Sequence, residues 1–269
     1  MTNYLQLMDN SKFSPEEEAL ARYFGEGNYQ TFYRKQIVQN KLKITKDDFI
    51  SGDIKTMYAA MRQLGIEYSY CDYPESLRKY LLRNVWPSTM KALRDEIYVS
   101  GFLDKPVFVK PRDNMKRFTG FICESVDDIT QNAKGAGNGV KIWYSDVIHF
   151  TSEYRCPIVN GKLRGCYHYS NHNPYDYIKY RKALFETVQK MADENKEGNS
   201  AYCLDVGITN KGEIALIEMT DGFSFGKYGM SDELLAEVLI TRWSELKNER
   251  DWSSYNRKID WSSLWKRWT

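Results

Sequence analysis

The sequence predicts an α+β protein. Two observations lead to this fold class: helical patterns dominate about the first hundred residues, and the region that follows is rich in antiparallel hairpins. The 269 residues are enough for one large domain or two lobes. We therefore expect three regions: a helix-rich N-terminal region over 1–100, the main α+β region over 101–246, and a Trp-rich tail over 247–269.

Helix signals come first along the chain. Ser14 is a predicted N-cap, Glu17 completes a capping box, and a glycine ends the helix that follows. A second helix is expected over 54–64 and also stops at a glycine. The segment 73–97 then predicts two short helices separated at Pro87, because proline interrupts a helix.

Strand signals begin at Val107. Asn160-Gly161 lies between alternating segments and predicts a tight hairpin. Two further helices are expected, one from Pro174 to about Met191 and one from Ser231 to near Leu246. The predicted strands before the hairpin are VFVKP (107–111), FTGFICE (118–124) and VKIWYSDVIHF (140–150).

The segment 201–222 predicts another hairpin, and this one carries carboxylates. If Lys211-Gly212 is a two-residue loop, Asp205 lies directly opposite Glu218. Glu218 would share a strand face with Ile214 and Leu216, where an apolar residue is expected. Facing side chains are about 4.5–5.5 Å apart, so the two acids repel each other. A cation between them removes the repulsion, and magnesium suits one or two carboxylates plus substrate phosphates.

Two alternatives to this metal site stay open. A three-residue loop places Asp205 and Glu218 on opposite faces of the hairpin. The other alternative is a solvated sheet face on which both acids are simply exposed.

Three basic residues complete a candidate phosphate site. Lys110 ends the strand VFVK, Lys116 precedes the next strand, and Arg155 lies in the Asn160-Gly161 hairpin. Lysines at strand ends bind phosphates as point charges, and arginine stabilises a transferring phosphoryl group. Taken singly, each residue fits an ordinary surface role better. Together with the two-carboxylate hairpin, they favour a phosphate–magnesium site.

Composition argues against several other classes. The net charge of +2 gives no electrostatic signal for nucleic acid. Five cysteines without Cys-x-x-Cys spacing favour reduced thiols and a cytoplasmic location, and three scattered histidines argue against zinc. No apolar run approaches the roughly 18 residues of a membrane span. The Gly-rich segment 134–141 lacks the P-loop pattern. Trp261, Trp265 and Trp268 recur at helical spacing, which favours a docked terminal helix over a membrane or nucleic-acid contact.

The ordered motifs VFVKP, KRFTGF, SEYR, LDVG and LIEMTDGFSFG resemble the ATP-grasp superfamily. More narrowly, they resemble the phage and bacterial clade marked by one Arg and two Lys. That clade is related to eukaryotic ATP-grasp proteins that assist assembly of a translation initiation factor. The resemblance covers about Asp72 to Tyr228, and the segment 72–89 resembles the pre-ATP-grasp part of the clade.

The resemblance implies two α+β subdomains that clasp ATP, and it implies a role for each candidate residue. Arg155 would face the transferring phosphoryl group or the acyl-phosphate, and Asp205 and Glu218 would hold magnesium. The residues that would contact the nucleotide are Lys110 and Lys116 at the phosphates, and Tyr144, Ser145, Asp146 and Val147 on the adenine side.

One position departs from the pattern of the superfamily. Many ATP-grasp enzymes carry Asn two residues after the metal-binding Glu, and here this position is Thr220. The turn signal Asp221-Gly222 ends the strand, so Asp221 is free to swing towards the metal. We therefore expect Asp205, Glu218 and Asp221 to form the metal site, with Thr220 secondary. The alternative is that Asp221 only caps the turn.

The resemblance also implies a function. ATP-grasp enzymes join a carboxylate to an amine or thiol through an acyl-phosphate and release ADP. For this clade a peptide or protein acceptor is expected, in the host cytoplasm if the protein is encoded by a phage. The alternative is an ATP-loaded binding module, an assembly chaperone or inhibitor without turnover.

Overall fold

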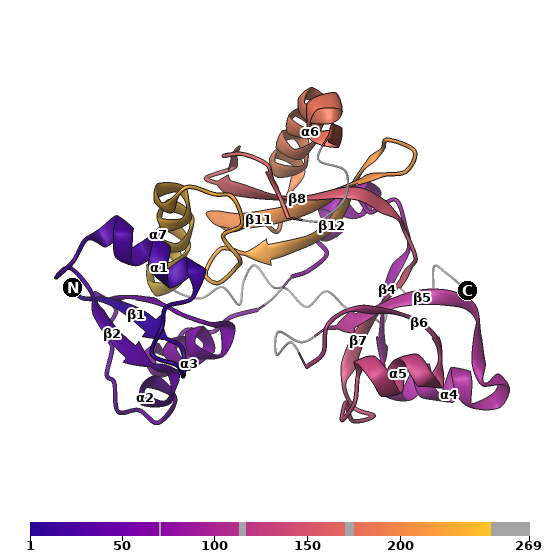
Figure 1. Cartoon of the computed structure of the whole chain (residues 1–269), viewed down its shortest axis with the longest axis horizontal. Coiled ribbons are helices and arrows are strands. Elements are labelled where there is room, and N and C mark those ends of the chain that lie inside the picture. The colour runs from indigo at the N-terminus through magenta and orange to yellow at the C-terminus, as the bar shows by residue number, and fades with distance from the viewer. Residues whose placement is uncertain (70, 113–116, 170–174, 249–269) are drawn as a thin grey trace.

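The computed structural model describes residues 1–69, 71–112, 117–169 and 175–248. These residues form three sheets, each accompanied by helices, and this confirms the predicted α+β class (Figure 1). A central sheet lies between two smaller lobes, one formed by the N-terminal residues and one formed by strands β4 to β7. Within the described ranges, no helix is both long and apolar enough to cross a membrane.

The N-terminal lobe contains a three-stranded parallel sheet in the order β2-β1-β3. The sequence patterns do not predict this sheet, because its strands have only five, four and three residues. The helix signals are confirmed: the Ser14 hydroxyl accepts hydrogen bonds from the first turn of α1, and Gly65 ends α3 in the left-handed conformation. The elements of this lobe are β1 (Asn3–Leu7), α1 (Pro15–Phe24), β2 (Gln30–Tyr33), α2 (Arg34–Val38), β3 (Phe49–Ser51) and α3 (Ile54–Leu64).

The second lobe, called the β4–β7 lobe below, has an antiparallel sheet in the order β4-β7-β5-β6. The expected pair of short helices around Pro87 is partly wrong: a 3-10 helix, η1, and α4 flank strand β4, which contains Pro87. Proline fits there because β4 is an edge strand. The elements are η1 (Glu75–Tyr80), β4 (Val85–Thr89), α4 (Met90–Ser100), β5 (Phe102–Pro111), β6 (Phe121–Ser125), α5 (Val126–Asn132) and β7 (Lys141–Asp146).

The central sheet has the order β10-β8-β11-β12, with β9 paired to β8. Asn160 and Gly161 both have positive φ and form the predicted hairpin turn between β8 and β9. The elements are β8 (Phe150–Val159), β9 (Lys162–Leu163), β10 (Tyr167–His168), α6 (Tyr175–Glu194), β11 (Ala201–Thr209), β12 (Ile214–Asp221) and α7 (Asp232–Asn248).

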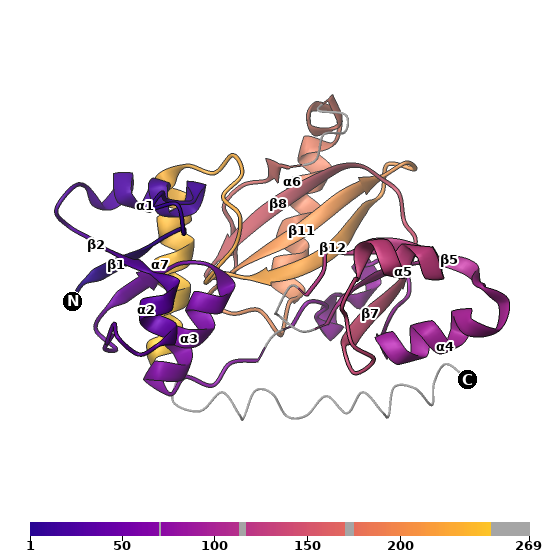
Figure 2. The same cartoon turned by 60° about the horizontal axis from the view of Figure 1, so that its bottom comes forward.

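The two faces of β11 have different neighbours, because side chains alternate along a strand. Leu204 and Val206 belong to the core beneath α6, whereas Ala201 and Cys203 belong to the core shared by α7 and the N-terminal lobe. Figure 2 shows β11 and β12 running between the N-terminal lobe and the β4–β7 lobe. Asp205 is therefore on the α7 side of the sheet, between the two lobes.

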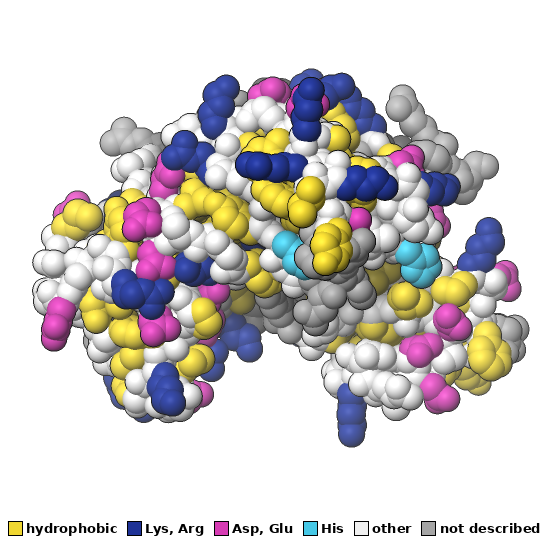
Figure 3. All heavy atoms as spheres, turned by 45° about the horizontal axis from the view of Figure 1, so that its top comes forward, with side chains coloured by type: hydrophobic (Ala, Val, Ile, Leu, Met, Phe, Trp, Pro, Cys, Tyr) yellow, Lys and Arg dark blue, Asp and Glu magenta, His cyan; other side chains and the backbone are white. Residues whose placement is uncertain are grey.

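The opposite face of the central sheet is covered by α6. Lys and Arg side chains lie among hydrophobic ones over this part of the surface (Figure 3). Tyr175 and Ile178 of α6 are 74% and 78% exposed. This surface is separated from Asp205 by the sheet itself.

Candidate functional site

Asp205 and Glu218 are directly paired across β11 and β12, which confirms the pairing predicted from the sequence. The structure reaches this pairing by a different route. The loop has three residues, Asn210 to Gly212, because Thr209 N–H donates to Glu213 C=O at 2.8 Å. The expected two-residue loop is therefore wrong.

A β-bulge compensates for the longer loop. Val206 pairs with Leu216, and Asp205 pairs with Glu218, so Ile217 is one extra residue in β12. Leu216 and Met219 both pack beneath α6, whereas Glu218 lines a cavity on the other face. The expectation that Glu218 shares a face with Leu216 is wrong, because the bulge reverses the alternation between them.

Arg155 lies next to Asp205 because β8 pairs with β11. Its Nε and Nη2 atoms donate to the two carboxylate oxygens of Asp205 at 2.8 and 2.5 Å. Burial raises the pKa of Asp205, and the charge of Arg155 opposes that rise. The Arg155 guanidinium also lies 4.9 Å from the ring of Tyr228, and Nη1 donates to Gly226 C=O at 3.3 Å. Two edges of the guanidinium are thus fixed, and Nη1 is directed at the cavity.

Lys110 connects the β4–β7 lobe to the central sheet. Its Nζ atom lies 2.5 Å from Glu218 Oε2 and 3.1 Å from Asp72 Oδ1, above the ring of Tyr73 at 4.8 Å. Burial acts to lower the pKa of Lys110, but the charges of Asp72 and Glu218 outweigh it and raise the pKa well above its ordinary value. The lysine is therefore a permanent cation at neutral pH, placed against one of the two paired carboxylates.

Asp72 is a site residue that the sequence did not single out. Its carboxylate accepts a hydrogen bond from Trp143 Nε1 at 2.7 Å, and its backbone C=O accepts one from Met219 N–H at 2.8 Å. Together with its contact to Lys110, these bonds join β5, β7 and β12 at one point. No local pattern distinguishes this Asp, because all three partners are distant in the sequence.

The predicted adenine-side residues lie at the end of β7. Tyr144 and Ser145 are buried, and Asp146 accepts hydrogen bonds from the backbone and side chain of Asn84 at 3.0 and 2.8 Å. Val147 follows the strand directly. Their contact with a nucleotide stays a prediction. Lys116 lies outside the described residues.

Asp221 lies at the end of β12, and it has partners of its own. Arg242 on α7 donates to its two carboxylate oxygens at 2.8 and 3.1 Å, and Asn199 donates at 2.7 Å. Burial raises the pKa of Asp221, and the charge of Arg242 opposes the rise. Thr220 and Glu218 both line the cavity, as expected for residues on one strand face.

The described residues contain no group of three His, Cys, Asp or Glu side chains placed to hold a metal ion. The metal set Asp205, Glu218 and Asp221 stays a prediction. The pair Asp205 and Glu218 nevertheless fits magnesium by its chemistry, since it presents hard carboxylate oxygens from adjacent strands. A cation already accompanies each acid, Arg155 for one and Lys110 for the other.

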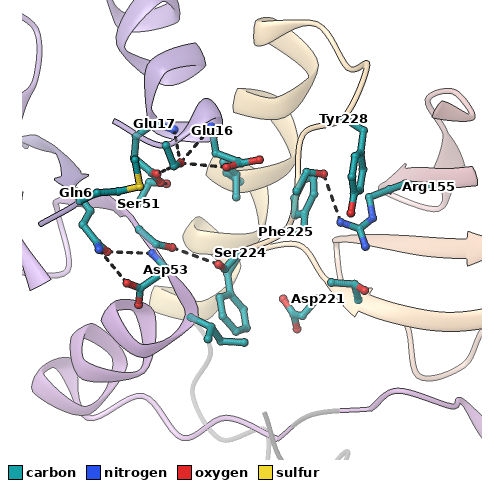
Figure 4. A pocket seen from close by; sticks show the side chains of 18 of the residues that line it. Gln6, Glu16, Glu17, Ser51, Asp53, Arg155, Asp221, Ser224, Phe225 and Tyr228 are labelled. Carbon is teal, nitrogen blue, oxygen red and sulfur yellow. Dashed lines mark hydrogen bonds between the residues drawn. The ribbon is translucent and has the colours of Figure 1, made fainter. Parts of the chain in front are cut away.

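A cavity of about 510 Å³ extends from this site to the N-terminal lobe. Figure 4 shows Arg155 and Tyr228 on one side, Glu16 and Glu17 on the other, and Ser224 and Phe225 between them. Its volume is in the range of small-ligand sites. The polar lining from the N-terminal lobe comprises Gln6, Ser14, Glu16, Glu17, Ser51 and Asp53, and that from the sheet side comprises Arg155, Glu218, Thr220 and Asp221.

Solved structures with similar folds define the class of protein. A D-alanine–D-alanine ligase from Coxiella burnetii aligns with a TM-score of 0.54 and 9% identity, covering 98% of this chain and 99% of that one. A RimK domain protein ATP-grasp from Sphaerobacter thermophilus aligns with a TM-score of 0.52 and 14% identity, covering 89% and 98%. At these identities the likeness shows the fold, which is the ATP-grasp fold.

The family follows from the sequence itself. Residues 80–238 match a family of ATP-grasp domains, family 2 of the clade that is named after one arginine and two lysines. This match spans more than half of the chain, so the protein belongs to that ATP-grasp family. No curated protein matches the sequence.

Proposed function

We propose that the protein is an ATP- and magnesium-dependent ligase that joins a carboxylate to an amine or thiol and releases ADP. The observation that carries this proposal is the meeting of Lys110, Arg155, Asp205 and Glu218 between two lobes of an ATP-grasp domain. The acids and bases of such a site position ATP and neutralise its charge, and phosphoryl transfer requires little else from the protein.

In the proposed reaction, a substrate carboxylate oxygen attacks the γ-phosphorus of ATP. The bond from that phosphorus to the β,γ-bridging oxygen breaks, so ADP leaves and an acyl-phosphate forms. The amine or thiol then attacks the acyl carbon, phosphate leaves, and the nucleophile loses its proton to solvent.

Each chain residue has a separate task in this scheme. Lys110 and Lys116 bind the phosphates, and the segment from Tyr144 to Val147 contacts the adenine. Arg155 turns Nη1 towards the developing charge, since Asp205 already holds the other edge of its guanidinium. Asp205, Glu218 and Asp221 are the proposed magnesium ligands, and the ion would neutralise phosphate charge.

The proposed acceptor is a peptide or protein, as the resemblance to the phage clade and its eukaryotic assembly-factor relatives suggests. The cavity supports a narrow acceptor, since about 510 Å³ accommodates the end of a chain but not a folded domain. Mass spectrometry tests this directly: cell-lysate proteins are incubated with the protein, ATP and magnesium. We expect a reproducible mass change on one target, absent when the Arg155→Lys variant is used.

The second candidate is an ATP-loaded binding module without turnover. Thr220 favours it, and so does the pairing of each site carboxylate with its own cation. The two functions differ in one simple measurement, ADP release when lysate is added. Release that depends on lysate supports the ligase, and tight ATP binding without release supports the binding module.

A further inference from the structure

The β-bulge at Ile217 decides where Glu218 points. With a three-residue loop and a regular strand, Glu218 would face the core beneath α6, on the side occupied by Leu216. The extra residue moves Glu218 to the cavity face and opposite Asp205. Bulges next to active sites commonly re-aim a side chain in this way.

A bulge leaves backbone groups without partners in the ladder, and here one arginine supplies them. Arg83 Nη1 donates to Leu216 C=O at 2.8 Å, and Nη2 donates to Ile217 C=O at 2.9 Å. The two carbonyls belong to the residue before the bulge and to the bulged residue itself. A planar guanidinium fork fits two adjacent carbonyls, which a lysine cannot reproduce.

The chain before Arg83 is shaped to deliver it. Leu82 has φ +52° although it is not glycine, and its side chain is 47% exposed. Such a backbone conformation is uncommon for a bulky residue. Arg83 Nη1 also donates to Leu81 C=O at 3.1 Å, which fixes the guanidinium to its own turn.

We propose that Arg83 is a positioning residue that holds the bulge of β12 and thereby aims Glu218 at the magnesium site. This inference rests on the proposed role of Glu218 in binding magnesium. Arg83 would not touch the ion. It acts through the backbone of residues 216 and 217, as outer partners of metal ligands do when they orient a carboxylate.

The experiment titrates magnesium against the thermal stabilisation of the full chain by a fixed concentration of ATP. Manganese binding, followed by electron paramagnetic resonance, gives a second readout that needs no substrate. Arg83→Met should raise the half-saturating magnesium concentration by about 10–100-fold, as loss of an outer partner commonly does. Arg83→Lys should shift it in the same direction, since it keeps the charge but loses the fork.

Arg78→Met is the matched control. Arg78 lies in η1 and also donates to a backbone carbonyl, that of Val85 at 2.9 Å, but it does not contact the bulge. It should lower stability without moving the magnesium curve. If Arg83→Met lowers stability alone, or if Arg78→Met shifts the curve equally, Arg83 is only a structural residue.

Deleting Ile217 adds an independent test. The deletion leaves a regular strand in which Glu218 still follows Leu216 and faces Asp205, so the Arg83 fork loses its purpose. In that background Arg83→Met should cause no further change in magnesium requirement. If the deletion prevents folding, the comparison of Arg83 and Arg78 variants decides. Glu218→Gln separates the two levels: an unmoved magnesium curve in that variant refutes the proposed metal role itself.

Discussion

Replacing Asp221 with Asn separates its proposed metal role from its ion pair with Arg242. The substitution removes one charge while keeping the size of the side chain. Arg242 is 3% exposed, and it retains Glu245 at 2.7 Å. Breaking a buried pair completely costs about 3–5 kcal/mol. Because Glu245 remains and the Asn oxygen still accepts a hydrogen bond, we expect a loss of about 1–3 kcal/mol.

This loss corresponds to a fall in Tm of about 2–12 °C for a chain of this size. A metal role predicts a second effect, which stability alone does not produce. If Asp221 is a ligand, Asp221→Asn should raise the half-saturating magnesium concentration at least about 10-fold, clearly more than Thr220→Val does. Both quantities come from one set of thermal unfolding curves with ATP and increasing magnesium.

Arg242→Met is the matched control, because it breaks the same ion pair and keeps the carboxylate. It should destabilise the fold by about 3–5 kcal/mol, since Asp221 is left buried without its cation. Its magnesium requirement should not rise. An unmoved magnesium curve in Asp221→Asn would refute the metal role, leaving Asp205 and Glu218 as the only ligands and Asp221 as a structural residue.

Three further outcomes are expected. Arg155→Lys should keep ATP binding and lose about 10²–10³ in turnover, measured as ADP release, because a point charge cannot replace the planar fork; an equal loss of binding would make Arg155 a ground-state contact. Lys110→Met should remove most of the stabilisation by ATP with magnesium, which is about 2.7 kcal/mol for the wild type at 100 times Kd; an undiminished thermal shift contradicts its phosphate role. Burial raises the pKa of Glu17 above its usual value of 4.5, so its contribution to stability is full below that pH and is lost as pH rises through the folded-state pKa. Urea unfolding at several pH values should therefore show a weaker pH dependence in Glu17→Gln than in the wild type, and no such change when the exposed Glu18 is replaced by Gln.

The local features of this fold are readable from the sequence. The caps at Ser14 and Gly65 and the turn at Asn160-Gly161 depend on interactions within a few residues, so the residue types alone indicate them. The ordered motifs likewise indicate the ATP-grasp family, and the family match confirms it. The short strands of the N-terminal sheet are not readable in this way, because three to five residues carry too little periodicity.

The pairing of Asp205 with Glu218 lies between these cases. A count based on a two-residue loop predicts the right pair, but the molecule has a three-residue loop and a one-residue bulge. The two differences cancel in the pairing. They do not cancel in the strand faces, so the position of Leu216 relative to Glu218 was decided by the bulge.

Tertiary structure alone decided the partners of the charged residues. Arg83 and Leu216 are 133 residues apart, and Asp72 and Trp143 are 71 apart. The chain has 38 Lys and Arg and 36 Asp and Glu, so residue type leaves far too many possible pairs. The physical reason is the range of the interactions: caps and turns form within a few residues, whereas a buried charge finds its partner only after the sheets have packed.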